Sequence, residues 1–164
     1  MPDVHPLAGL EAALLRGDDE AAEQATHALT ATAEPALLAW LAASDPDRRW
    51  WAARALAHCG GSPAAPALAH VLTTDDPALR SVAAYALGHL HQRAPDAVHP
   101  LLPQLARLLA DSDGSVRQTA ADALALCGDD AVPVLATVLQ GNHEGARTRA
   151  AAALRKIASQ PVAA

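Results

Sequence analysis

The stretch LAHVLTTDDPALRSVAAYALG, Leu68–Gly88, decides the fold because it holds the end of one helix, a turn and the start of a second helix. The Asp76 carboxylate can accept the free amide hydrogens of a helix N-terminus, and Pro77 follows at the first helical position, where a missing N–H costs nothing. A stripe of small and apolar residues then recurs at helical spacing: Ala83, Ala84, Leu87 and Leu90. The stretch therefore predicts a helix–turn–helix unit whose second helix is buried along one side.

The same unit recurs along the chain. Counted from the position of Asp76, the cap positions are Asp18, Asp45, Asp76, Asp113 and His143, at intervals of 27, 31, 37 and 30 residues. Leucines precede every cap by eight and four residues, and an arginine follows each of the last four caps by four residues: Arg49, Arg80, Arg117 and Arg147. We interpret these arginines as a ladder that pairs with the cap aspartates. The pattern is an internal repeat that covers nearly the whole sequence.

The repeated unit resembles the HEAT repeat in its short PBS-lyase-type form. The resemblance is carried by the Asp-x-x-x-Arg step, the Ala-Ala pair and the leucine that follows, as in DDPALRSVAAYALG and SDPDRRWWAARALA. The end units depart from it, since the Asp18 unit has Ala22 in place of the arginine and the last unit has His143 in place of the aspartate. Atypical terminal units are usual in such arrays. The resemblance implies an all-α fold, an α-solenoid with a right-handed superhelix of about five antiparallel helix pairs.

We expect a single domain over residues 1–164. Its units are predicted at about residues 7–31, 34–61, 62–92, 95–128 and 129–159. The longest interval, 37 residues, includes segment 92–99, which precedes a proline-rich stretch and is predicted to be a loop with one extra helical turn.

Composition limits the kinds of partner. The 164-residue chain has a formal net charge of −6, which argues against nucleic acid as a partner because phosphate backbones attract clustered Lys and Arg. The start of the sequence lacks the features of a signal peptide, and no apolar run is long enough to cross a bilayer. We therefore expect a cytoplasmic protein that does not bind membranes, and a monomer is slightly favoured. Cys59 and Cys127 are expected to be reduced and buried.

The sequence shows no motif of enzymatic chemistry. Its His143-Glu144 pair is similar to the iron-binding pairs of deoxyhypusine hydroxylase, a HEAT-repeat enzyme, but it occurs once and at a cap position. His58 and His89 occupy the same slot of neighbouring repeats, which are too widely spaced for an easy shared metal ion. We therefore predict no catalytic residue, no metal site and no cofactor.

Side chains that the fold does not repeat are better candidates for function. Positions 5, 9 and 13 after each cap point away from the buried stripe of the second helix, and HEAT-like solenoids usually line their concave surface with this helix. The predicted partner-binding residues are Trp50, Trp51, Arg54, His58, Ser81, Tyr85, His89, Gln118 and Asp122. Aromatic residues and Arg are favoured at protein-binding hot spots. For Trp51, which lies alongside these positions, packing into the core is an equal alternative, and Trp40 is expected to be core.

These observations favour a non-enzymatic interaction module that binds another protein or a peptide through its second helices. The alternative is a lyase-like or cofactor-handling subunit, because PBS-lyase-type relatives include subunits of the bilin (phycobilisome) lyases. A third hypothesis, nucleic-acid binding like that of the HEAT-like DNA glycosylases, is weakened by the acidic charge.

Overall fold

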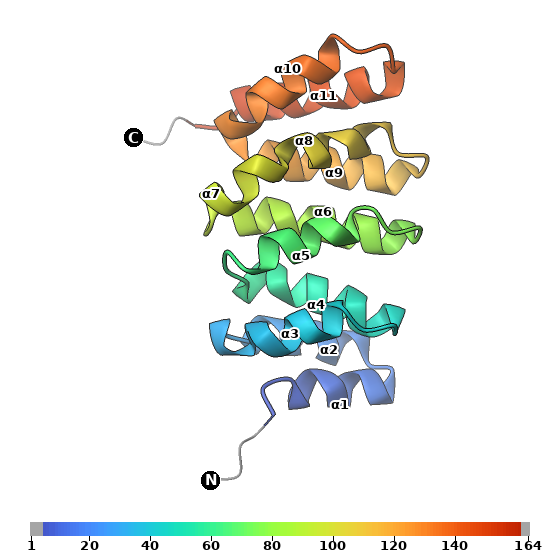
Figure 1. Ribbon diagram of the computed structural model, residues 1–164, viewed down its shortest axis with the longest axis vertical. Coiled ribbons are helices and arrows are strands. Elements are labelled where there is room, and N and C mark those ends of the chain that lie inside the picture. The colour runs from blue at the N-terminus through green and yellow to red at the C-terminus, as the bar shows by residue number, and fades with distance from the viewer. Residues whose placement is uncertain (1–4, 162–164) are drawn as a thin grey trace.

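The structure is a computed structural model that describes residues 5–161, and its helices stack in antiparallel pairs along one axis (Figure 1). The first helices of the pairs are α1 (Ala8–Arg16), α3 (Glu34–Leu41), α5 (Ala64–Val71), α8 (Leu102–Arg107) and α10 (Val132–Leu139). The second helices are α2 (Asp19–Ala28), α4 (Pro46–Cys59), α6 (Pro77–His91), α9 (Gly114–Leu126) and α11 (Glu144–Ala158). No strand occurs in residues 5–161. The predicted all-α solenoid of five helix pairs is confirmed.

Short helical segments fill the connections between the pairs. The 3₁₀ helices η1 (Ala31–Ala33) and η4 (Gly128–Ala131) lead into α3 and α10, and η3 (Leu108–Ala110) extends α8. The additional residues of the fourth unit form α7 (Pro95–Val98) and η2 (His99–Leu101). Each of α7, η2 and α8 carries a proline at one of its first two positions, where proline starts a helix but cannot continue the preceding one.

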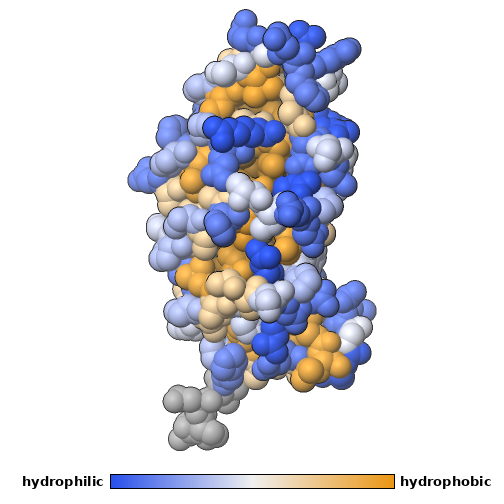
Figure 2. All heavy atoms as spheres, turned by 45° about the vertical axis from the view of Figure 1, so that its right-hand side comes forward, coloured by the Kyte–Doolittle hydropathy of each residue, from blue (hydrophilic) through white to orange (hydrophobic). Residues whose placement is uncertain are grey.

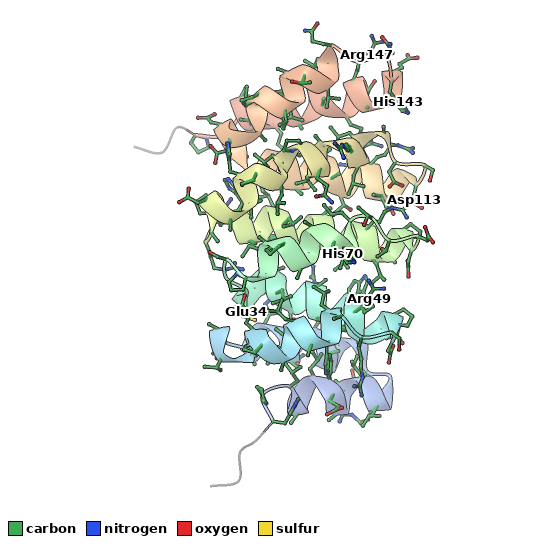
Figure 3. The ribbon with its side chains drawn as sticks, in the orientation of Figure 1. Glu34, Arg49, His70, Asp113, His143 and Arg147 are labelled. Atoms are coloured by element: carbon green, nitrogen blue, oxygen red, sulfur yellow. The ribbon has the colours of Figure 1, made fainter. Side chains whose placement is uncertain are left out.

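The repeated caps start the second helices as predicted. The Asp76 carboxylate accepts from the backbone N–H groups of Ala78 and Leu79 at 2.8 and 3.4 Å, and Asp45 and Asp113 do the same in their own units. In the last unit, Nδ1 of His143 accepts from the Ala146 N–H at 3.0 Å. Figure 3 shows Asp113 and His143 on the same side of the stack, one above the other, as expected for equivalent positions of neighbouring repeats.

The repeated arginines act differently from the predicted ladder with the cap aspartates. Arg80 donates to the backbone carbonyls of Thr74 and Asp75, both at 2.9 Å, and pairs with Asp111 in the loop of the next repeat. Arg117 likewise donates to loop carbonyls of its own repeat, at 2.7 and 3.0 Å. Arg80 and Arg117 thus fasten the intra-repeat loops and do not pair with the cap carboxylates of their own units.

The core consists almost entirely of leucine and alanine, and the second helices pack closely within it. Leu56, Leu87 and Leu124 are fully buried in α4, α6 and α9. At the contact between α6 and α9, a Cβ added to Gly88 would lie 2.8 Å from Cα of Ala123, well inside van der Waals contact. The two backbones therefore approach each other as closely as a glycine allows.

The longest helices of the described chain, α6 and α11, have 15 residues each. Within residues 5–161, none of the helices has the length and apolar character that a bilayer span requires.

Candidate functional site

A surface groove crosses three consecutive second helices. It has a volume of about 360 Å³ and is lined by residues of α4, α6 and α9: Trp50, Arg54, Ala78, Ser81, Val82, Tyr85, Ser115 and Thr119. Four of these, Trp50, Arg54, Ser81 and Tyr85, belong to the set predicted from sequence. The groove exists because equivalent positions of stacked helices lie side by side, about one helix diameter apart. We call it the second-helix groove.

Arg54 links the groove to the first repeat. Its Nε and Nη2 donate to both carboxylate oxygens of Glu23 on α2, with Nη2 at 2.7 Å from Oε1. The Arg54 guanidinium also lies over the Tyr85 ring, 4.4 Å from the ring centre. Hydrogen bonding from Arg54 lowers the pKa of Glu23, so this carboxylate is ionised at neutral pH. Arg54 is thus held in place by partners from the repeats on either side of it.

A row of rings continues from Tyr85 toward the ends of the same helices. The ring centres of Tyr85 and His89 lie 4.3 Å apart, those of His89 and His58 6.4 Å, and those of His58 and His27 4.2 Å. Burial lowers the pKa values of His58 and His89, because desolvation disfavours the imidazolium form. Both side chains are therefore neutral at physiological pH.

The three tryptophans divide between core and groove. Trp51 is only 9% exposed and belongs to the core, so its assignment to the partner-binding surface is wrong, while Trp40 is buried as expected. Trp50 is half-buried, packs edge-on against Trp51 with ring centres 4.9 Å apart, and lines the groove. The adjacent pair splits because successive residues of a helix point about a quarter-turn apart.

The remaining predicted residues extend toward the last repeat. Gln118 donates to Asp122 at 3.2 Å on α9, and its side-chain oxygen accepts from Arg149 of α11. Lys156, also on α11, donates to Asp122 at 3.3 Å. The Gln118 and Asp122 side chains thus connect α9 to α11 and do not line the groove.

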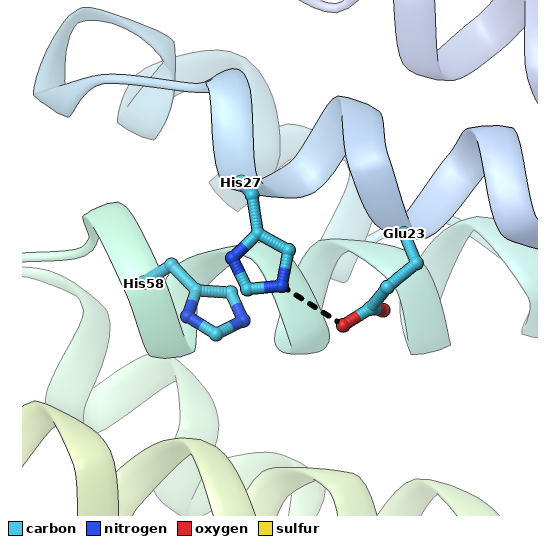
Figure 4. A group of neighbouring side chains, drawn as sticks. All are labelled: Glu23, His27 and His58. Carbon is cyan, nitrogen blue, oxygen red and sulfur yellow. Dashed lines mark hydrogen bonds and ion pairs between the residues drawn. The ribbon is translucent and has the colours of Figure 1, made fainter.

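Glu23 and His27, which the sequence analysis did not select, complete a cluster with His58 (Figure 4). They lie five and nine residues after the cap Asp18, which are the same slots that define the predicted face in the other repeats. That spacing is therefore a usable signal, although the first unit otherwise diverges from the repeat pattern.

A second, mostly apolar groove of about 330 Å³ lies between the first helices α8 and α10, with Ala106, Val134 and Val138 among its lining residues. Figure 2, which brings forward the ends with the intra-repeat loops, shows hydrophobic side chains gathered along the middle of the view, with hydrophilic ones on either side. Apolar surface is thus present away from the predicted face as well.

The HEAT-repeat family model matches this chain over residues 34–107 and 102–164, and so over more than half of its length. The chain belongs to the HEAT-repeat family. No curated protein matches it. This HEAT-repeat chain is similar to an engineered protein of known structure at 27% identity and a TM-score of 0.55, with 93% of this chain and 79% of that one covered.

Two further solved structures share the fold. One is the complex of CpcE and CpcF of phycocyanin lyase from Nostoc sp., with a TM-score of 0.70 at 21% identity, covering 90% of this chain and 99% of that one. The other is a designed armadillo repeat protein, with a TM-score of 0.52 at 16% identity, covering 90% of this chain and 85% of that one. At these identities the likeness concerns the solenoid architecture alone.

Proposed function

We propose that this HEAT-repeat protein is a non-enzymatic interaction module that binds a protein or peptide partner in the second-helix groove. The observation that carries the proposal is the continuity of the groove across α4, α6 and α9, with half-buried Trp50, Arg54 and Tyr85 along it. A surface that spans several repeats suits an extended segment of another chain. HEAT repeats commonly serve as protein-interaction modules.

The lining of the groove has the composition of a binding surface. Covering a partly exposed aromatic ring stabilises the complex with a partner. Trp, Tyr and Arg dominate measured hot spots. Between them, the Ser81 hydroxyl donates to Thr119 at 2.9 Å, so α6 and α9 also present hydroxyl groups to a bound chain. Arg54 is already neutralised by Glu23, and the groove therefore favours a partner that binds through apolar and hydrogen-bonding groups.

The test compares how tightly the wild-type chain and a Trp50→Ala/Tyr85→Ala double variant bind a protein partner. Proteins retained by the immobilised chain from an extract of the native host are identified, and the dissociation constant of each purified candidate is measured against both forms. We expect the double variant to bind about thirtyfold more weakly, corresponding to a loss of roughly 2 kcal/mol. Leu15→Ala is the matched control, because Leu15 is an 83% exposed apolar residue on α1, outside the groove. Unchanged affinity of the double variant would place the binding surface elsewhere.

The lyase-like alternative is favoured by one observation, the fold shared with the phycocyanin lyase subunits. It predicts that a tetrapyrrole mixed with the chain changes its absorbance and fluorescence. A chain that acts only as an interaction module leaves both spectra unchanged.

A further inference from the structure

The junction between the first two repeats brings together a carboxylate and two imidazoles. One possible ligand atom from each of Glu23, His27 and His58 lies within 4.8 Å of the other two. Glu23 and His27 are four residues apart on α2 and therefore share one face of the helix, while His58 comes from the last turn of α4 (Figure 4). We call these three residues the junction cluster.

The hydrogen bonds within the junction cluster leave one of its nitrogen atoms without a partner. His27 Nε2 lies 3.2 Å from Glu23 Oε1, so these two side chains satisfy each other. The Nε2 atom of His58 is buried and has no hydrogen-bond partner in the described part of the chain. A buried polar atom without a partner costs free energy, and a neutral imidazole nitrogen can serve as a metal ligand.

We propose that Glu23, His27 and His58 form a binding site for a divalent transition-metal ion, with Zn²⁺ as the ion that they fit best. Imidazole nitrogen together with carboxylate oxygen suits Zn²⁺ and its neighbours in the first transition row, whereas Mg²⁺ and Ca²⁺ prefer oxygen ligands throughout. Three protein ligands complete all but one position of a tetrahedral Zn²⁺ site.

Binding requires only a modest contraction of the junction cluster. Zn²⁺ with ligands at about 2.1 Å places the ligand atoms roughly 3.4 Å from one another. Since the present separations do not exceed 4.8 Å, the largest closure is about 1.4 Å. Side chains can make this movement, because those of Glu23 and His27 are 32% and 56% exposed. The same exposure gives the ion a path from solvent.

The neighbouring charges set the strength of the site. Arg54 holds Glu23 and faces the junction cluster, so a bound cation competes with the guanidinium for the carboxylate. Arg54 also lies over the Tyr85 ring, a contact that does not involve Glu23. The lowered pKa of His58, caused first by burial and then by His27 and Arg54, keeps its imidazole in the neutral form that binds a metal. An ion in this site joins α2 to α4 and thereby ties the end repeat to the rest of the solenoid.

The test is calorimetric titration of the untagged full-length chain with Zn²⁺. We expect one equivalent to bind, and His27→Gln and His58→Gln to weaken that binding about tenfold or more. His27 is exposed, so its variant folds even if the His58 variant does not. His70→Gln is the matched control, because His70 is an exposed histidine on α5, the first helix of the third pair (Figure 3). This substitution is expected to leave the affinity unchanged.

Thermal unfolding gives a second readout, since a ligand that binds only the folded state raises Tm. Zn²⁺ should raise the Tm of the wild type and of the His70→Gln variant by the same amount, and that of the His27→Gln variant by clearly less. The proposal is overturned if the wild type binds no Zn²⁺, or if the His27 variant binds as tightly as the wild type, which would place the ion at other histidines among the eight in the chain.

Discussion

At the scale of single residues, Arg80 on α6 and Asp111 in the intra-repeat loop of the next repeat form a well-shielded ion pair. Their side chains are 9% and 14% exposed, and Arg80 Nε lies 2.8 Å from Asp111 Oδ2. Hydrogen bonding from Arg80 is the main cause that lowers the pKa of Asp111 below its ordinary value of 3.8. A carboxyl whose pKa is depressed on folding adds stability above its unfolded pKa, and this is lost as the pH falls through the folded pKa.

We therefore expect Asp111→Asn to lower the free energy of unfolding by roughly 1–3 kcal/mol at pH 7, because it removes hydrogen bonds between charged groups. The difference from the wild type should begin to shrink as the pH falls below about 4, the ordinary pKa of this carboxyl in the unfolded chain, and should disappear below its lowered pKa in the folded protein. Urea unfolding at a series of pH values measures this. Asp122→Asn is the control, since Asp122 forms an exposed pair with Lys156 and should change stability by less than about 1 kcal/mol. Identical pH dependence in the two variants would contradict the role given to Asp111.

At the scale of elements, the contact between α6 and α9 depends on Gly88. Inside a helix, Gly→Ala normally stabilises by about 1 kcal/mol. Here the new methyl group would meet Cα, Cβ and O of Ala123 at 2.8, 2.9 and 3.1 Å, and two of these atoms are backbone that cannot rotate away. We expect Gly88→Ala to force α6 and α9 apart and to lower the free energy of unfolding by roughly 1–3 kcal/mol. Chemical denaturation measures the effect.

Gly9→Ala in α1 is the matched control for this contact. An added Cβ at Gly9 meets no atom within 4 Å, so the substitution should be neutral or stabilising by up to about 1 kcal/mol. If both variants gain stability, the two backbones are farther apart than described.

Helices and their caps were predictable because their signals are local. Asp76, Pro77 and the leucine spacing act within a few residues, and the structure places α6 where they indicate. The partner of Arg80 was not predictable, since Asp111 is 31 residues away and lies beside it only after the repeats have stacked. The burial of Trp51 was not predictable for a similar reason. Whether a ring beside a helical stripe faces inward depends on what the next helix leaves uncovered.

At the scale of the whole molecule, the junction cluster could be predicted only in part from the sequence. The slots of Glu23 and His27 could be counted from Asp18, but their closeness to His58 depends on how α2 stacks on α4. The second-helix groove was easier to predict, because equivalent positions of adjacent repeats must be neighbours in any solenoid. Repetition thus makes the face predictable and leaves the contacts of the divergent end unit to be found in the structure.

Stacking also determines how stability is distributed along the solenoid. Each helix pair packs only on its neighbours, so an inner pair is supported on two sides and an end pair on one. The inner second helices α4, α6 and α9 carry fully buried leucines, whereas the end helix α11 buries only alanines and α1 leaves Leu15 83% exposed. Local opening should therefore cost least at the ends and most in the centre.

Hydrogen exchange measured by mass spectrometry tests this gradient. We expect the amides of α6 and α9 to exchange slowest, close to the rate set by global unfolding, and those of α1, α2 and α11 to exchange faster because the end pairs open without unfolding the rest. Length does not explain the difference, since α6 and α11 have 15 residues each, but only α6 has a neighbouring repeat on both sides. This pair of helices is thus the internal control. Equal protection of α6 and α11 would show that the solenoid opens only as a single cooperative unit.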